Sequence, residues 1–395
     1  MLLAAVAMAL VPSAPSVAAP SVAAPSVAAP SVAAPSAPSV GAPFGTRLLF
    51  RLADPRINEA SGIAAGITSP GVVYVHNDSG DAPRFFALDA RTGATLAVYT
   101  VPGAAALDWE DIAVAPDARG VPSVWLGDIG DNNGVRREIQ VYRVDEPRVD
   151  PTRRDVAVPS SPAEVWRLRY PDGAVDAESL AVAPDGTPYV VTKSLLGSST
   201  VFAAPRQARA GRIQQLRRLG SIQFALTSTP GPFSLAGHLM ATGADVSRDG
   251  SLLTVRTYTD AYLWRLRGGD VAAGLRRAPV RVALPEQPQG EGIAIAGSRL
   301  LVDSERAGSA VYAVPIPATL RTSAPPAGAP PETRAPASAP VLSAAPPVSS
   351  AARTRRAAGT GRLLWLGGAV VIAGGAETLW IARRRRSGRA AARPR

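Results

Sequence analysis

The middle of the chain repeats one pattern five times. Each copy has a small or acidic residue, a short apolar run, a turn, and a second apolar run that ends in polar residues. The copies begin at Ser61, Glu110, Glu178, Thr242 and Glu291, at intervals of 49 to 68 residues. Strand–turn–strand units that recur at such intervals are typical of the blades of a β-propeller. We therefore predict an all-β fold with a five-bladed β-propeller, in which the two longest intervals leave room for a sixth blade.

Further apolar segments supply the remaining strands of the blades. RFFALDA, IQVYRVDEP and AVYAVPI follow the first, second and fifth copies as third strands, and RIQQLRRLGSI is long enough to be the outer strand of the third blade. The segment TRLLFRL at residues 46–52 is expected to complete the last blade. A ring that is closed by strands from both ends of the domain hides its edge strands.

Composition divides the chain into a folded centre and biased ends. Residues 12–43 and 322–352 consist largely of Pro, Ala, Ser and Val. Such segments cannot bury enough apolar surface to offset the entropy of the chain. We predict a signal peptide at 1–19, a Pro/Ala/Ser low-complexity segment at 20–44, the propeller at 45–320, a disordered Pro/Ala-rich stalk at 321–362, a transmembrane helix at 363–382 and a basic cytoplasmic tail at 383–395.

Both ends of the chain point to a membrane. Residues 2–11 form an apolar run that is too short to span a bilayer but suits the core of a signal peptide, although no positive charge precedes it. Residues 363–382 are long enough to cross a bilayer as a helix of about 30 Å. Seven arginines follow this segment, and such a flank stays in the cytoplasm. We therefore expect a single-pass protein of the cell membrane, with the propeller outside and the C-terminus in the cytoplasm.

The positive net charge of +11 lies outside the predicted propeller. Residues 45–320 contain 29 basic and 29 acidic residues, whereas the rest of the chain contains 13 arginines and 2 glutamates. A neutral domain gives no support for a nucleic-acid partner. The chain has no cysteine, which excludes disulfides, thiolate metal sites and cysteine nucleophiles.

The geometry of a propeller gathers certain residues around one mouth of its central channel. The first strand of each blade starts on the face where the antiparallel second strand ends, so the residues before the first and after the second strand meet there. In this chain these positions are rich in charged side chains, whereas the opposite face receives plain Asp-Gly turns. The candidate ligand-binding residues at the mouth are His76, Glu110, Asp111, Glu178, Lys193, Arg256, Glu291 and Glu305.

Two loops at the predicted mouth share the form D-x-G-D. They run from Asp78 to Asp81 and from Asp128 to Asp131. The glycine lets each loop turn back, so that both carboxylates can approach one point. Clustered oxygens suit calcium, which takes about six to eight oxygen ligands. The candidate metal ligands are Asp78, Asp81, Asp128, Asp131 and Asn132; alternatively, these side chains cap turns through their own backbone.

Some segments are more specific than the blade pattern. They read NDSGD, DWEDIAVAP, GDIGDNN and GADVSRDG, the last with RTYTDAYLW. The blades resemble those of NHL and YWTD-type propellers. Residues 45–317 also resemble a group of exported bacterial propellers and, weakly, the propeller family described as having esterase-like activity of phytase. The resemblance implies an exported propeller, but it matches no motif that identifies a catalytic residue.

Two functions are open at this point. The first is a membrane-anchored extracytoplasmic binding or interaction protein, whose acidic mouth binds calcium and takes a small molecule, a glycan or a protein. The second is a calcium-dependent phosphoesterase or esterase-like hydrolase, in which paired carboxylates act as acid and base and Lys193, Arg256 and Arg136 hold a phosphate. The chain has no GxSxG, Walker A or Rossmann glycine pattern. Because no catalytic signature is present, we favour the binding protein and assign no catalytic residue.

Overall fold

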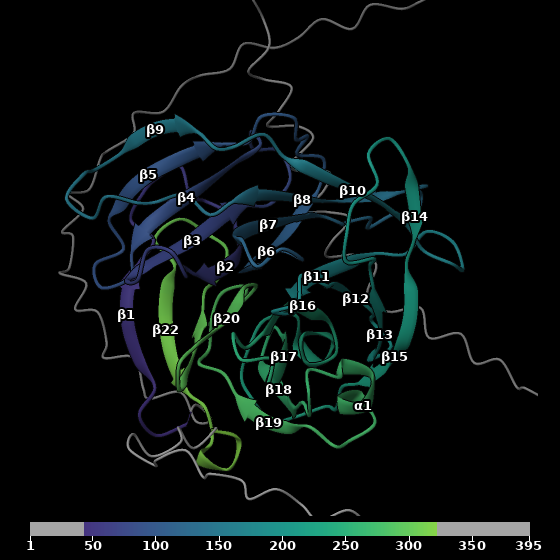
Figure 1. The fold of residues 1–395 in the computed structure, drawn as a ribbon. Helices are drawn as coiled ribbons and strands as arrows, with labels where there is room; N and C mark the ends of the chain where they lie inside the picture. Colours follow the sequence, from purple (N-terminus) through teal and green to yellow (C-terminus); the bar gives the residue numbers. More distant parts are fainter. Residues whose placement is uncertain (1–42, 322–395) are drawn as a thin grey trace, which may run out of the picture. The chain divides into compact units, whose positions relative to one another are not determined.

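A computed structural model describes residues 43–321. These residues form five β-sheets, which are arranged as blades around one axis (Figure 1). The innermost strands of successive blades contact one another, and the innermost strand of the last blade contacts that of the first. The predicted five-bladed β-propeller is thus confirmed, and the described residues contain no sixth blade.

The first two blades have five strands each. From the axis outward, the first contains β2 (Ala60–Ala65), β3 (Val72–Asn77), β4 (Arg84–Asp89), β5 (Thr95–Thr100) and β9 (Val156–Pro159). The second contains β6 (Trp109–Pro116), β7 (Pro122–Asp128), β8 (Ile139–Asp145), β10 (Glu164–Arg169) and β14 (Ile213–Gln215). Neighbouring strands are antiparallel, except that β9 runs parallel to β5 and β14 runs parallel to β10.

The other three blades have four strands each. The third contains β11 (Ala177–Val182), β12 (Pro188–Thr192), β13 (Ser198–Ala203) and β15 (Arg217–Gln223). The fourth contains β16 (Ala241–Val246), β17 (Leu252–Thr257), β18 (Asp260–Arg265) and β19 (Val280–Ala283). The fifth contains β20 (Ile293–Ala296), β21 (Arg299–Val302), β22 (Ala310–Pro315) and β1 (Arg47–Arg51).

The last blade is closed by the N-terminal strand, as the sequence predicts. β1 pairs with β22 in antiparallel register, with Arg47 opposite Ala313 and Arg51 opposite Ala310. The edge that β22 would otherwise expose is therefore paired.

The two long intervals between repeats contain extra strands and a long loop instead of a sixth blade. β9 and β10 lie in the first interval, and β14 and the loop 224–240 lie in the second. The predicted outer strand RIQQLRRLGSI is divided: β14 joins the second blade, and only β15 belongs to the third. Leu216 lies between them, is 2% exposed, and donates its backbone N–H to the carbonyl of Arg169 at 2.9 Å. The strand breaks where Leu216 enters the core.

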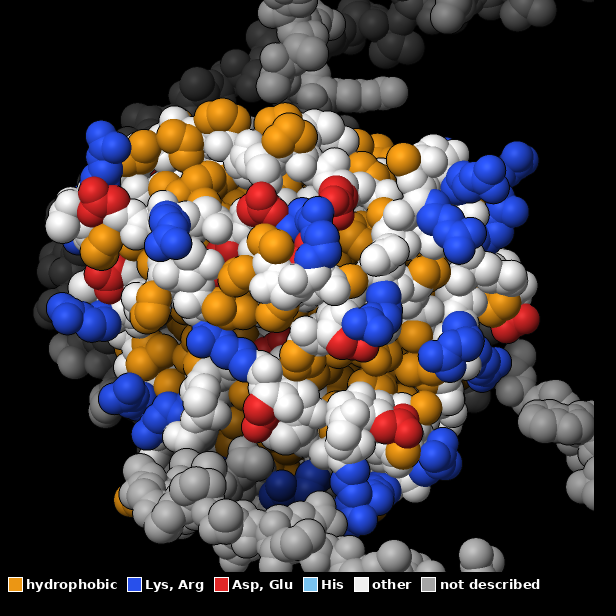
Figure 2. Space-filling model, in the orientation of Figure 1, with side chains coloured by type: hydrophobic (Ala, Val, Ile, Leu, Met, Phe, Trp, Pro, Cys, Tyr) orange, Lys and Arg blue, Asp and Glu red, His pale blue; other side chains and the backbone are white. Residues whose placement is uncertain are grey.

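Burial falls from the axis to the rim. β11 and β12 are buried at every residue, whereas β15 is mostly exposed or half-buried. Apolar clusters join neighbouring blades; for example, Tyr74 and Phe85 of the first blade pack with Trp109 and Leu126 of the second. Each Å² of apolar surface that such packing removes from water stabilises the fold by about 25 cal/mol. On the face shown in Figure 2, Lys and Arg side chains gather mainly around the rim.

The helical elements among residues 43–321 are short. They are α1 (Val271–Leu275), η1 (Ser234–His238) and η2 (Ala318–Leu320). Asp270 caps α1 by accepting a hydrogen bond from the backbone N–H of Ala273 at 2.9 Å. No helix in this part of the chain has the length and apolar character needed to span a bilayer. The predicted signal peptide, the predicted transmembrane helix and the stalk beyond residue 321 lie outside the described residues.

Candidate functional site

Four of the five innermost strands begin with a β-bulge. β2, β6, β11 and β16 each shift register against their partner strand near their first residues, so that one residue of each strand has no residue opposite it. These residues are Ser61, Glu110, Glu178 and Thr242, and Glu291 occupies the corresponding place before β20. The repeat thereby places Glu110, Glu178 and Glu291 at matching positions around one mouth of the channel.

The two hydroxyl residues at these positions join neighbouring blades. Ser61 Oγ donates a hydrogen bond to the carbonyl of Glu110 at 2.6 Å, and Thr242 Oγ1 donates one to the carbonyl of Glu291 at 3.1 Å. The side chains of Glu110, Glu178 and Glu291 are also buried. Buried carboxylates are costly unless other charges or hydrogen bonds compensate them, so their surroundings decide what the mouth can bind.

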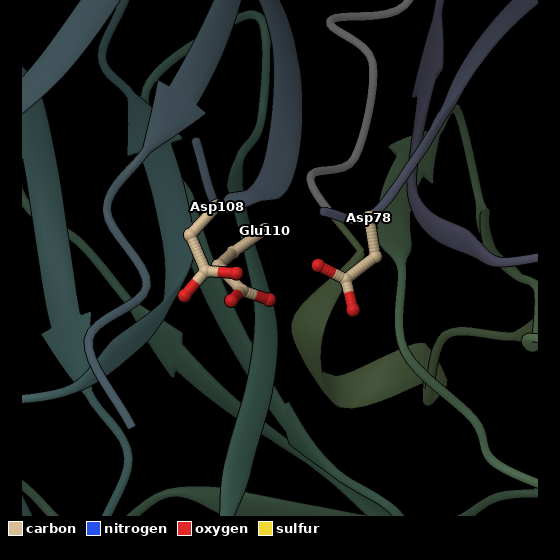
Figure 3. A group of neighbouring side chains, drawn as sticks. All are labelled: Asp78, Asp108 and Glu110. Carbon is tan, nitrogen blue, oxygen red and sulfur yellow. The ribbon is translucent and has the colours of Figure 1, made fainter. Parts of the chain in front are cut away.

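Three carboxylates from the first two blades converge at the mouth. Asp78 follows β3, Asp108 precedes β6 and Glu110 belongs to β6; in Figure 3, Asp108 and Glu110 lie side by side and Asp78 faces them. One oxygen of each side chain lies within 4.8 Å of the other two. Glu110 is buried, whereas Asp78 and Asp108 are half-buried. We call these three residues the carboxylate triad.

The loop after β7 packs directly against the triad. A Cβ atom placed on Gly130 would lie 2.6 Å from Asp108 Oδ2 and even nearer to Glu110 Oε1. The backbone N–H of Gly130 donates to the carbonyl of Asp108 at 3.2 Å, and Arg136 donates to the carbonyl of Gly130 at 2.8 Å. A side chain at residue 130 would therefore displace the carboxylates of Asp108 and Glu110. Asp108 and Gly130 were not among the predicted site residues, although the specific segments DWEDIAVAP and GDIGDNN contain them.

Burial and mutual repulsion raise the pKa values of the triad. Burial raises the pKa of Asp108 to about 7, and the negative charges of Asp78 and Asp176 add to this effect. Burial also raises the pKa of Glu110 well above its ordinary value, and the charges of Asp78 and Glu178 act in the same direction. A cation bound among these oxygens would favour the charged forms and lower the pKa values.

A second charged group lies on the third to fifth blades. Lys193, the only lysine of the chain, forms a buried ion pair with Glu178 and lies 5.6 Å from the centroid of the Tyr258 ring. Burial raises the pKa of Glu178 to about 8, although Lys193 acts in the opposite direction. Burial raises the pKa of Glu291 well above its ordinary value, and the negative charges of Glu178 and Glu305 act in the same direction. The structure therefore brings these predicted ligand residues close enough to affect one another's charge.

The predicted metal ligands do not form one group. Asp78 belongs to the triad. Asp128 is fully buried, accepts hydrogen bonds from the backbone N–H groups of Leu107 and Asp108 at 3.4 and 3.2 Å, and pairs with Arg136 at 2.8 Å. Through its hydrogen bonds to Leu107 and Asp108, Asp128 holds the loop before β6 in place.

Asp81 and Asp131 bond within their own loops. Asp81 forms an ion pair with Arg84 at 2.8 Å. Asp131 accepts a hydrogen bond from the backbone N–H of Val135 at 2.9 Å, and Asn132 is exposed. The hydrogen bond to Asp131 is of the turn-capping kind that the sequence left open as an alternative.

Asp111 lies on the axis, beneath the surface of the mouth. Its fully buried carboxylate accepts hydrogen bonds from the backbone N–H groups of Ile112 at 2.8 Å, Leu180 at 2.9 Å and Ala244 at 3.0 Å. It therefore links the innermost strands of three blades. The corresponding position of the first blade is Gly62, where a Cβ atom would lie 2.7 Å from the nitrogen of Ile112. The innermost strands of the first and second blades therefore lie close together here.

His76 and Arg256 are also fully buried. The Nδ1 atom of His76 donates a hydrogen bond to the carbonyl of Asn77 at 2.7 Å, and burial lowers the pKa of His76 to about 4. Arg256 donates hydrogen bonds to the carbonyls of Gly292 at 2.9 Å and Asp303 at 3.2 Å. These two predicted ligand residues, like Asp111, contact the protein interior.

Without added divalent cations, we expect the protein to be more stable at pH 5 than at pH 8. Folding raises the pKa of Asp108 from 3.8 to about 7 and that of Glu178 from 4.5 to about 8. At a pH between the unfolded and the folded pKa of such a group, the folded state binds more protons than the unfolded state. The free energy of unfolding therefore falls as the pH rises. Urea unfolding in EDTA at both pH values measures this change. A free energy that increases from pH 5 to pH 8 would contradict the expectation, and Asp108→Asn should reduce the pH dependence.

Comparison with known proteins assigns the chain to no family. No family model and no curated protein matches the chain. The PQQ-bound aldose sugar dehydrogenase from Streptomyces coelicolor is 12% identical with a TM-score of 0.38, and the match covers 71% of this chain and 99% of that one. A nidogen/laminin complex is 13% identical with a TM-score of 0.34, covering 63% of this chain and 73% of that one. The resemblance to exported bacterial propellers stays a prediction, and the chain's own sheet topology assigns it to the five-bladed β-propellers.

Proposed function

We propose that this chain is a ligand-binding propeller whose mouth holds a calcium ion in the carboxylate triad. The observation that carries the proposal is the convergence of Asp78, Asp108 and Glu110, with one oxygen of each within 4.8 Å of the others. The raised pKa of Asp108, to about 7, supports it, because burial and neighbouring negative charges disfavour three ionised carboxylates in the absence of a cation.

Calcium fits this site better than a softer metal. All the donors of the triad are carboxylate oxygens, which hard cations prefer. Three carboxylates provide between three and six oxygens, whereas calcium takes about six to eight. The remaining positions are available to water or to an oxygen of a ligand, because Asp78 and Asp108 are partly exposed.

The hydrolase alternative has less support from the site. The three basic side chains proposed to hold a phosphate already have partners. Lys193 pairs with Glu178, Arg136 pairs with Asp128, and Arg256 is buried against backbone carbonyls. We therefore place the binding function first.

Calcium is expected to stabilise the purified full-length protein. Binding at about 100 times the dissociation constant adds about 2.7 kcal/mol to the free energy of unfolding, which raises the melting temperature of a domain of this size by a few degrees. Thermal melts with calcium chloride and with EDTA measure this shift. The double variant Asp108→Asn/Glu110→Gln should lose it, and Asp131→Asn should keep it, because Asp131 accepts hydrogen bonds within its own loop.

A variant outside the triad sharpens the test. Gly130→Ala places a methyl group against Asp108 and Glu110, so the calcium shift should shrink although every carboxylate is retained. Gly220→Ala is the matched control, since its Cβ atom would meet nothing within 4 Å. The proposal fails if calcium produces no shift in the parent protein, or if the double variant shows the same shift.

We also propose that the protein works outside the cell, anchored by residues 363–382. The support is the apolar run and the seven arginines that follow it. A reporter that is active only in the cytoplasm, fused after Arg395, tests the orientation; an inactive reporter in a protein that reaches the membrane would contradict it.

A further inference from the structure

Exposed apolar side chains gather at the mouth end of the propeller. Eleven large hydrophobic residues among residues 43–321 are exposed, and seven of them lie in loops at the mouth. We call these seven the apolar crescent: Leu107, Val135, Leu195, Leu196, Leu226, Phe233 and Leu235. Contiguous exposed apolar surface with polar neighbours is typical of interaction sites.

Two loops of the crescent pack against each other. The backbone N–H of Phe224 donates to the carbonyl of Gly197 at 2.8 Å, which joins the loop 224–240 to the loop 193–197. The ring of Phe233 lies 4.7 Å from the ring of Tyr258, over which Lys193 lies. The two loops therefore lie side by side, and Phe233 of the crescent packs next to the aromatic ring that Lys193 contacts.

The loop 224–240 is held in a fixed shape. Thr227 and Thr229 donate hydrogen bonds to the buried carboxylate of Asp260 at 2.9 and 2.8 Å, and His238 contacts Thr227 at 2.9 Å. Phe233 has a left-handed backbone with φ of 60°, a conformation that non-glycine residues rarely adopt without a compensating reason. The protein thus builds a rigid loop that keeps apolar side chains in water.

The mouth beside the crescent has more carboxyl groups than basic groups. Acidic residues there include Asp78, Asp108, Glu110, Asp176, Glu178, Glu291 and Glu305, and the basic side chains that act on their pKa values include Lys193 and Arg136. One calcium ion neutralises only part of this excess. Lys193 shows how an ammonium group fits here, against Glu178 and over the Tyr258 ring.

We propose that this end of the propeller docks a polypeptide that presents a Lys or Arg side chain between apolar residues. The cationic group enters the acidic mouth beside Glu178 and Glu291, and the apolar neighbours cover the crescent. Charge complementarity selects the cation, and apolar area removed from water stabilises the complex. The acidic mouth disfavours an anionic membrane surface on the same crescent. The proposal does not depend on calcium, because the crescent, Glu178 and Glu291 lie outside the triad.

Selection of random peptides displayed on phage, with immobilised full-length protein as the target, tests the proposal. Selection is done once in calcium and once in EDTA. We expect enriched peptides in both to carry Lys or Arg beside Leu, Ile, Phe or Trp. The variant Leu195→Ser/Leu196→Ser should weaken binding of an enriched synthetic peptide by about tenfold or more. The variant Val121→Ser/Ile213→Ser is the matched control, since its exposed apolar residues lie away from the mouth; it should bind like the parent.

Several results would overturn the docking proposal. In the selection, these results are enrichment of acidic or uncharged peptides, or no enrichment at all. In the binding measurement, the result is equal affinity of the parent and of a Leu195→Ser/Leu196→Ser variant with the same melting temperature. Binding of the crescent to vesicles of anionic phospholipid would also overturn the proposal. Failure of the calcium proposal is seen separately in the thermal melts. A protein without a calcium shift that still selects basic apolar peptides would retain the docking surface and lose the metal site.

Discussion

Replacing Arg256 with methionine is expected to lower the free energy of unfolding by about 3 to 5 kcal/mol, the usual cost of removing one partner from a buried ionic network. Arg256 is fully buried, and its guanidinium donates to the carbonyls of Thr257, Gly292 and Asp303 at 3.1, 2.9 and 3.2 Å. Burial lowers the pKa of Arg256 to about 10, opposed by the charge of Asp303, so the side chain is charged at neutral pH.

Methionine has a similar length but donates no hydrogen bond. Three buried carbonyls would lose a hydrogen-bond donor. Burial raises the pKa of Asp303 to about 7, although the charge of Arg256 lowers it. Without Arg256, the pKa of Asp303 would rise further. Denaturant unfolding of the parent and the variant measures the difference. Arg267→Met, at an exposed position, is the control and should change the free energy by less than about 0.5 kcal/mol. A loss below about 1 kcal/mol for Arg256→Met would show that the buried network does not stabilise the ring.

The second large effect is expected from Asp111→Ala, with a loss of about 3 kcal/mol or more. The substitution leaves three buried backbone N–H groups without an acceptor, on Ile112, Leu180 and Ala244. Each unsatisfied buried donor costs about 1 to 3 kcal/mol. Because these donors belong to three different blades, the variant weakens the centre of the ring.

Two further variants separate this effect from simple loss of volume. Asp111→Asn keeps one acceptor oxygen and should lose less than Asp111→Ala. Ser179→Ala changes the corresponding position of the third blade, where the buried Oγ has no hydrogen-bond partner among the described residues. It should therefore leave the free energy of unfolding nearly unchanged. If Ser179→Ala and Asp111→Ala destabilise the protein equally, the hydrogen bonds of Asp111 are not what joins the blades.

The repeat determined the fold because its information is local. Alternating apolar residues and short turns make each strand pair, and five such pairs that recur at these intervals are typical of a closed ring of blades. The same reasoning predicted the closing strand β1, since its place follows from the direction of the strands. The break at Leu216 was missed because no glycine, proline or other turn residue marks it in the segment RIQQLRRLGSI.

The tertiary structure alone decided which carboxylates meet. The two D-x-G-D loops look alike in sequence, yet Asp78 faces Asp108 and Glu110, whereas Asp128 pairs with Arg136. Asp111 and Glu110 are adjacent in the chain, yet one joins three strands on the axis and the other borders the mouth. The contacts of Asp78 with Asp108 and of Asp111 with Leu180 and Ala244 join different blades, at separations of about 30 to 130 residues in the chain. Local patterns of polarity hold no information on how closely two blades approach.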